Sequence, residues 1–234
     1  MTKSRLEQIQ SNLENVTLRI ELACTKVNRK LSEITLIAVT KTYPASEVEI
    51  LASLGIKNVG ENKDQEAFLK FEQVKAPLKW HFVGQLQSNK VKSVVNYANL
   101  IHSVDRLTLV KEIQKQAQKI NKIQPLLIQI DLDESPADEN RGGVSKENLV
   151  NLANQIAQFP NLDLQGLMSV APLGLDPEIA FDRLRDIQRH FLTQFPNAQI
   201  LSAGMSEDFE VAIAYGATHL RIGSGLLGER PQIG

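Results

Sequence analysis

Short apolar segments alternate with amphipathic segments along nearly the whole chain, and this alternation limits the possible folds more than any other feature. The apolar segments are typical of buried strands, and the segments between them have helical periodicity. We predict eight strands, at residues 35–41, 57–62, 79–84, 100–104, 125–131, 164–170, 199–203 and 218–223. Eight strands alternating with helices over 234 residues predict a closed parallel (β/α)8 barrel, the TIM barrel. An open doubly wound sheet is the alternative, and it would also place a ligand at the carboxyl ends of the strands.

An extra amphipathic helix precedes the first strand, with apolar residues at roughly helical spacing from residue 4 to about 30. Its apolar stripe has to be buried, so we expect this helix to cover the bottom of its own barrel, and contact with a partner is the alternative. No stretch resembles a linker, and the most polar stretch, residues 132–143, is typical of a surface loop. The sequence therefore predicts one domain over residues 1–234.

Composition limits the partners and the cellular compartment that we expect for this chain. The 26 basic and 27 acidic residues give a net charge of -1, which offers no electrostatic basis for binding nucleic acid or an anionic membrane. A single cysteine, Cys24, excludes an internal disulfide, and we expect it to be buried in the first helix. The polar amino terminus is unlike a signal peptide, and no apolar run is long enough to span a bilayer. We expect a cytoplasmic monomer.

Polar residues collect where the predicted strands end, and in a barrel these ends meet at one mouth. The candidates are Lys41, Asn62, His81, Gln85, Ser103, Ser169, Ser206, Arg221, Gly223 and Ser224. In the last strand, Leu220 and Ile222 share one face and Arg221 lies on the other. If the apolar face packs on helices, Arg221 points toward the ligand, although an arginine in a strand is also typical of a solvated edge.

Two turns near the carboxyl terminus are typical of an anion site. Ser206 is predicted to cap a helix that has Glu207 and Asp208 in its first turn. The Gly223-Ser224-Gly225 segment follows a strand and opens a short helix, where free backbone N–H groups attract phosphate. A merely flexible turn is the alternative interpretation of the second segment.

Lys41 directly follows an apolar strand. A partly buried amine there is suited to forming a Schiff base with an aldehyde, although a lysine at a strand end also commonly extends to solvent. An aldehyde that carries a phosphate would use both the amine and the anion site, and pyridoxal phosphate is such a molecule. The four histidines lack metal-ligand spacing, and nucleotide and serine-hydrolase motifs are absent from the sequence. Glu61 and Glu207 are candidate acid-base groups. The alternative is that Glu61 is a solvated loop acid and Glu207 an acid at a helix N-terminus.

Several sequence blocks, in the same order, resemble the pyridoxal phosphate homeostasis protein family (YggS/PROSC type), whose barrel is similar to the amino-terminal domain of alanine racemase. The blocks are AVTK at 38–41, GEN at 60–62, WHFVGQLQSNK at 80–90, HSVDR at 102–106, GLMSVAP at 166–172 and LSAGMSEDFEVAIAYGATHLRIGSGLLGER at 201–230. The resemblance covers nearly the whole chain and implies a fold type III barrel that binds pyridoxal 5'-phosphate.

The resemblance also implies residue roles. Lys41 would form the aldimine with the cofactor, Arg221 would face its pyridine nitrogen, and Asn62 would lie beside the ring. The phosphate would be held by Ser206, Gly223 and Ser224. Arg141 stands where a lysine is expected, and Gln85 occupies a variable position; neither departure falls among the expected cofactor contacts.

The resemblance favours a non-enzymatic carrier of pyridoxal phosphate that acts in vitamin B6 homeostasis. Its candidate partners are apoenzymes that depend on this cofactor. A guanidinium facing the pyridine nitrogen leaves that nitrogen unprotonated and weakens the ring as an electron sink. The chain also ends shortly after its last helix, so we expect no second domain to supply an opposing base. An amino-acid racemase is the competing hypothesis, and a cofactor-free barrel that binds another phosphorylated metabolite is a third.

Overall fold

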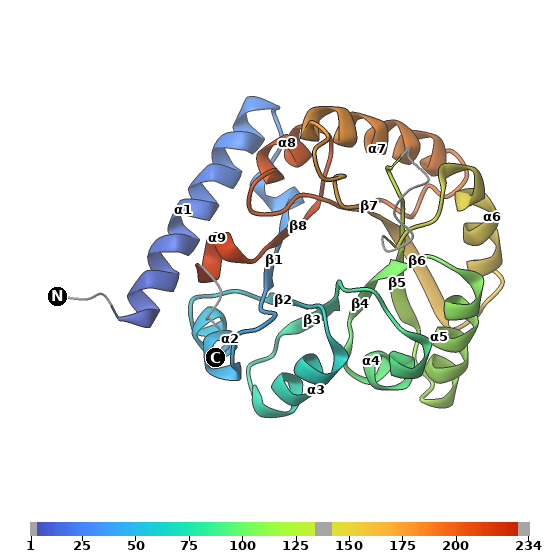
Figure 1. Cartoon of the computed structure of the whole chain (residues 1–234), viewed down its shortest axis with the longest axis horizontal. Helices are drawn as coiled ribbons and strands as arrows, with labels where there is room; N and C mark the ends of the chain where they lie inside the picture. Colours follow the sequence, from blue (N-terminus) through green and yellow to red (C-terminus); the bar gives the residue numbers. More distant parts are fainter. Residues whose placement is uncertain (1–3, 134–141, 229–234) are drawn as a thin grey trace.

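Eight parallel strands close into a barrel in the order of the chain, from β1 to β8 (Figure 1). The structure is a computed structural model and describes residues 4–133 and 142–228. The strands are β1 (Thr35–Val39), β2 (Asn58–Glu61), β3 (Lys79–Phe82), β4 (Leu100–Val104), β5 (Gln124–Gln129), β6 (Leu162–Met168), β7 (Ile200–Ser202) and β8 (His219–Ile222). β1 pairs with both β2 and β8, so the sheet has no free edge. The predicted (β/α)8 barrel is confirmed, and the open sheet is wrong.

Helices follow the strands and form a ring outside the sheet (Figure 1). They are α2 (Ala45–Ser53), α3 (Asp64–Gln73), α4 (Val91–Tyr97), α5 (Leu107–Lys119), α6 (Lys146–Ile156), α7 (Pro177–Leu192), α8 (Phe209–Ala214) and α9 (Ser224–Leu227). The helix predicted from residue 88 begins as a 3-10 turn, Ser88–Lys90, before α4. Among the described residues, no helix combines the length and apolarity that a membrane span requires.

Side-chain alternation along the strands divides the buried residues between two regions. In β8, Leu220 and Ile222 belong to the main core between sheet and helices, while Arg221 is buried on the opposite face, inside the barrel. This is the alternation predicted for the strand. A second, small apolar cluster consists of Leu100, Leu127 and Met168. Parallel strands covered on both faces bury both sets of side chains, which explains their nearly continuous apolar sequences.

The first helix, α1 (Arg5–Lys26), lies along the side of the barrel, against α8 and α9 (Figure 1). The expectation that it covers the bottom is therefore wrong. Its buried stripe includes Ile9, Val16 and Ile20, together with Cys24, which is buried as predicted. A stripe identifies the face that is buried, but not the surface that buries it.

Candidate functional site

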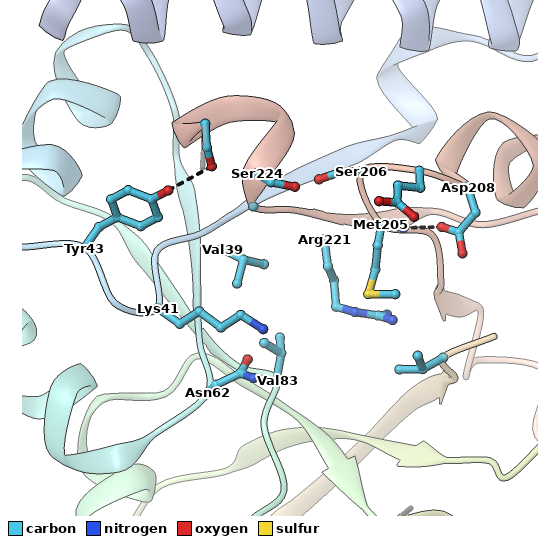
Figure 2. A pocket seen from close by; sticks show the side chains of 14 residues that line it. Val39, Lys41, Tyr43, Asn62, Val83, Met205, Ser206, Asp208, Arg221 and Ser224 are labelled. Carbon is cyan, nitrogen blue, oxygen red and sulfur yellow. Dashed lines mark hydrogen bonds between the residues drawn. The ribbon is translucent and has the colours of Figure 1, made fainter. Parts of the chain in front are cut away.

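A cavity of about 480 Å³ lies at the carboxyl ends of the strands (Figure 2). This volume suits a small cofactor. The lining includes six of the residues singled out in the sequence, contributed by segments that follow or end β1, β2, β7 and β8: Lys41, Asn62, Ser206, Arg221, Gly223 and Ser224. Residues separated by more than 180 positions in the sequence thus line one space, because parallel strands deliver their carboxyl ends to the same mouth.

Lys41 extends into this cavity from the sharp turn that ends β1 (Figure 2). The next residue, Thr42, has a φ of 71°, which is uncommon for a β-branched side chain. The backbone N–H of Thr42 donates to Glu66 Oε2 at 2.9 Å, so a side chain of α3 holds the turn. The Lys41 side chain is half-buried, so it is neither fully exposed to solvent nor enclosed.

A buried polar cluster of Thr40, Glu61 and Lys70 lies directly behind that turn. Lys70 Nζ donates to Glu61 Oε1 at 2.6 Å and to the Thr40 carbonyl at 2.7 Å, while the Thr40 hydroxyl donates to Glu61 Oε1 at 2.5 Å. Burial raises the pKa of Glu61, although Lys70 and Thr40 act in the opposite direction. The cluster ties the ends of β1 and β2 together. Glu61 is therefore neither a solvated loop acid nor a group that lines the cavity.

Asn62 follows β2 and lies beside the Lys41 side chain in the cavity (Figure 2). A glycine is required opposite it: a Cβ on Gly84 would lie 2.1 Å from the Asn62 carbonyl oxygen. That approach allows the segments after β2 and β3 to run close together at the mouth.

Ser206 and Ser224 face each other across the upper side of the cavity (Figure 2). Ser206 Oγ accepts a hydrogen bond from the Gly225 N–H at 3.1 Å, so the hydroxyl joins the two predicted turns. The predicted N-cap role of Ser206 is wrong. Asp208 occupies the N-cap position of α8, and its Oδ1 accepts from the Met205 N–H at 2.6 Å. That bond closes a separate turn over residues 205–208 and delays the helix.

Arg221 is the second cation of the cavity and is only 6% exposed. Its Nη1 donates to Ser202 Oγ at 2.8 Å, and its Nη2 donates to the Ser169 carbonyl at 2.8 Å. Burial lowers the pKa of Arg221 to about 10, while the charge of Asp208 opposes this shift. The guanidinium therefore stays protonated at neutral pH and offers only hydrogen-bond donors.

The remaining sequence candidates lie outside the cavity lining. His81 is buried inside the barrel and Ser103 is buried in β4, Ser169 contributes its carbonyl to Arg221, and Gln85 lies near Gly142. Arg141, where a lysine was expected, lies outside the described residues.

Sequence reasoning missed several lining residues. Tyr43, Met205 and Asp208 line the cavity, and the Tyr43 hydroxyl donates to the Gly228 carbonyl at 2.9 Å. Tyr43 stands two positions after Lys41, and this proximity was the one signal that could have identified it. The other two follow β7 in the turn whose shape depends on the Met205–Asp208 bond.

The donor set of the cavity suits an anionic ligand that also carries an electrophilic carbon. One primary amine, one guanidinium and two hydroxyls line the same space, with the start of α9 beside them. Glu207 is an exposed carboxylate that lines the cavity. Within residues 4–133 and 142–228, no group of three or more His, Cys, Asp or Glu side chains is arranged to hold a metal ion.

Comparison with known proteins places this chain in a family. The family described as alanine racemase, N-terminal domain, matches residues 11–231. The chain is 41% identical over 226 residues to a protein of Aquifex aeolicus named pyridoxal phosphate homeostasis protein, with 93% of this chain and 96% of that protein covered. An Escherichia coli protein of the same name is 36% identical over 239 residues, covering 96% and 98% of the two chains.

Solved structures agree with this relationship. PipY of Synechococcus elongatus PCC7942, solved with PLP bound, has a TM-score of 0.83 and 30% identity, covering 94% of this chain and all of PipY. An alanine racemase of Clostridium difficile 630 has a TM-score of 0.73 at 14% identity, a likeness of fold alone. That match covers 97% of this chain and 61% of the racemase.

Proposed function

The chain belongs to the pyridoxal phosphate homeostasis protein family, and we propose that it binds pyridoxal 5'-phosphate at the mouth of its barrel and buffers or carries the cofactor without turning over a substrate. The observation that carries this proposal is the convergence of Lys41, Arg221 and the two serines on one cavity. We further propose that residues 1–234 act as one domain.

Lys41 is the residue proposed to hold the cofactor covalently, as a Schiff base. Bound pyridoxal phosphate supplies an aldehyde, a phosphate and a pyridine ring. Lys41 would hold the aldehyde through its amine, whose neutral form has the lone pair that such a bond requires. The rigid turn after β1, fixed through Thr42 and Glu66, limits the positions that the amine can take. Tyr43 and Asn62 line the space around it.

The phosphate is proposed to lie between Ser206 and Ser224, against Gly223. Two hydroxyls can donate to phosphate oxygens, and Arg221 adds positive charge within the same cavity. The Ser206–Gly225 hydrogen bond keeps the two turns together and so keeps the hydroxyl groups within reach of one anion. The residues present therefore fit the cofactor in charge and in hydrogen-bonding character.

Arg221 supports a carrier over a catalyst. Its guanidinium cannot accept a proton and keeps its own protons at neutral pH, so a pyridine nitrogen that faces it accepts a hydrogen bond and stays unprotonated. The ring then withdraws less electron density than it does opposite a carboxylate, which disfavours carbanion formation on a bound amino acid. An alanine-racemase-like activity is the competing function, and Glu207 at the rim is the observation that favours it, because it is a carboxylate that lines the cavity.

The first experiment measures the absorption spectrum of the purified protein with added pyridoxal phosphate, before and after borohydride reduction. We expect a visible band that reduction abolishes, with the pyridoxyl mass fixed on the peptide that contains Lys41. Lys41→Ala should lose the adduct, while Lys63→Ala, at an exposed lysine in the N-cap position of α3, should keep it. An adduct on another lysine, or no binding, would overturn the proposal.

A second experiment separates carrier from enzyme. The loaded protein is incubated with a panel of L-amino acids in deuterated water, and D-isomers and α-proton exchange are measured. We expect neither to exceed the rate of free cofactor. Turnover that disappears in Lys41→Ala would favour the racemase instead. Transfer of cofactor to an apoenzyme dependent on pyridoxal phosphate tests the carrier role directly.

A further inference from the structure

A continuous row of hydrogen bonds crosses the interior of the barrel beneath the cavity and ends on Arg221. Asn58 Oδ1 lies 3.1 Å from His81 Nε2, and His81 Nδ1 lies 2.9 Å from His102 Nε2. His102 Nδ1 lies 2.9 Å from Ser202 Oγ, which accepts from Arg221 at 2.8 Å. We call these five residues the buried row. They come from β2, β3, β4, β7 and β8.

The interior of a (β/α)8 barrel is usually filled with branched apolar side chains. Here His102 and Ser202 are fully buried, and His81 is 4% exposed. The His102–Ser202 bond joins β4 to β7, which are not neighbours in the sheet. The row therefore crosses the barrel and does not run along its wall.

The chemistry of its two ends determines the direction of every bond. An amide oxygen can only accept, so His81 must carry its hydrogen on Nε2 to bond Asn58. A neutral His81 then has a bare Nδ1, which accepts from His102 Nε2–H. A neutral His102 likewise has a bare Nδ1, and only the Ser202 hydroxyl is there to donate to it. Having donated its one hydrogen, Ser202 can only accept from Arg221.

The two imidazoles are neutral for physical reasons. Burial lowers the pKa of His81 to about 3 and holds the pKa of His102 well below its ordinary value. Nearby groups that carry or can carry positive charge act in the same direction, His219 and Lys79 on His81, and His81, Arg221 and His219 on His102. At neutral pH the row thus contains one charge, at the Arg221 end. Its opposite end is the uncharged amide of Asn58.

We propose that the buried row positions Arg221. The fixed direction of its hydrogen bonds turns the Ser202 hydroxyl hydrogen toward His102 and a lone pair of Ser202 Oγ toward Arg221 Nη1, and the N–H groups of Arg221 that Ser202 and Ser169 do not use serve the cavity. The Ser169 carbonyl accepts a hydrogen bond from the other terminal nitrogen, Arg221 Nη2, and so fixes the orientation of the guanidinium plane. Ser202, His102 and His81 are positioning residues that act through Arg221 and do not line the cavity.

The consequence for the ligand rests on the proposed function. If pyridoxal phosphate occupies the cavity, the row sets how the guanidinium is presented to the pyridine ring, and hence the electronic state of the ring. The hydrogen-bond directions themselves do not depend on the ligand, so the two parts can be tested separately.

The first test is nitrogen NMR of the histidine side chains in the full chain without added cofactor, at pH 7. Assignment uses single histidine substitutions. We expect both His81 and His102 to be neutral, with the hydrogen on Nε2 and a bare Nδ1. A charged ring, or a hydrogen on Nδ1 of either residue, would overturn the proposal even in a protein that binds no cofactor.

The second test compares three serine variants for binding of pyridoxal phosphate and for the absorption spectrum of the bound cofactor. Ser202→Ala cuts the row beside Arg221, and Ser202→Thr keeps the hydroxyl. Ser103→Ala is the matched control, because Ser103 is about as buried as Ser202, follows His102 in β4, and has a hydroxyl with no partner among the described residues. We expect Ser202→Ala to weaken binding about tenfold and to shift the absorption maximum, since a hydrogen bond to a charged group is lost.

The outcomes distinguish this proposal from the proposed function. Wild-type spectrum and affinity in Ser202→Ala, with the cofactor bound normally by the unaltered protein, would overturn the positioning role and leave the proposed function standing. Equal losses in Ser202→Ala and Ser103→Ala would indicate general damage to the core and would also count against it. Recovery of the spectrum in Ser202→Thr supports the hydroxyl as the cause.

Discussion

Glu61 and Lys70 form a nearly dehydrated ion pair behind the turn that carries Lys41. The two side chains are 0% and 8% exposed, and Glu61 Oε2 has no hydrogen-bond partner among the described residues. Such a pair contributes little net stability compared with apolar side chains, but removing one partner leaves an uncompensated buried charge. Its effect on Lys41 is indirect, through the Thr40 carbonyl that Lys70 also binds.

Lys70→Met should therefore lower the free energy of unfolding by about 3 kcal/mol at pH 7, because it leaves Glu61 buried without its cation. Urea unfolding measures the change. Lys57→Met, at an exposed lysine, is the matched control and should change stability by less than about 0.5 kcal/mol. The double variant Glu61→Gln/Lys70→Met should recover part of the loss. Equal stability of Lys70→Met and its control would show that the pair is not a constraint on this turn.

Much of the candidate site could be predicted at the residue scale. Strand-end position and resemblance together identified the six predicted residues that line the cavity. The role of Glu61 could not be predicted, because its partner Lys70 lies on a helix whose rotation is set by packing. The N-cap prediction for Ser206 failed for a similar reason. Its hydroxyl accepts a hydrogen bond from Gly225, which is distant in sequence, whereas capping rules consider only residues within the next helical turn.

At the scale of elements, the alternation of strand and helix patterns was sufficient to predict the barrel, and the observed ends fall close to the predicted ones. The placement of α1 was not predictable from its stripe. Its polar side chains show why it lies where it does: Asn12 Nδ2 donates to the Leu226 carbonyl at 2.9 Å, and Arg5 donates to the Leu227 carbonyl at 2.8 Å. These carbonyls end α9, so α1 caps the short helix that carries Ser224.

We predict that Asn12→Ala weakens pyridoxal phosphate binding several-fold and lowers the free energy of unfolding by about 1 kcal/mol, because the end of α9 loses a hydrogen bond. Fluorescence titration and urea unfolding measure the two effects. Gln10→Ala removes an exposed side chain from the same helix and is the control. If Asn12→Ala changes stability but not affinity, α1 supports the fold without tuning the cavity.

At the scale of the whole molecule, the barrel encloses ionisable groups that it keeps uncharged. His81 and His102 lie in the buried row, and the His219 ring lies 6.3 Å from that of His81. Burial lowers the pKa of His81 to about 3 and that of His219 to about 4, and the pKa of His102 also falls well below its ordinary value. In the unfolded chain these histidines regain ordinary values near 6.5.

Acid should therefore destabilise the fold before most carboxylates titrate. Below about pH 6.5 these histidines bind protons in the unfolded chain, but in the folded barrel they do so only near pH 3 to 4. The free energy of unfolding is therefore highest above about pH 6.5 and falls as the pH decreases through this range. Each such histidine lowers the free energy of unfolding by about 1.4 kcal/mol per pH unit. Urea unfolding between pH 7 and pH 5 measures the slope.

His219→Gln isolates one histidine of this set. It removes a group that the row does not include, so the slope between pH 7 and pH 5 should become shallower by about one histidine's share while the row stays intact. His190→Gln, at an exposed histidine of α7, controls for the substitution itself. An unchanged slope in His219→Gln would mean that this side chain takes up its proton in the folded barrel as readily as in the unfolded chain. The uncharged barrel interior would then be confined to the two imidazoles that lead to Arg221.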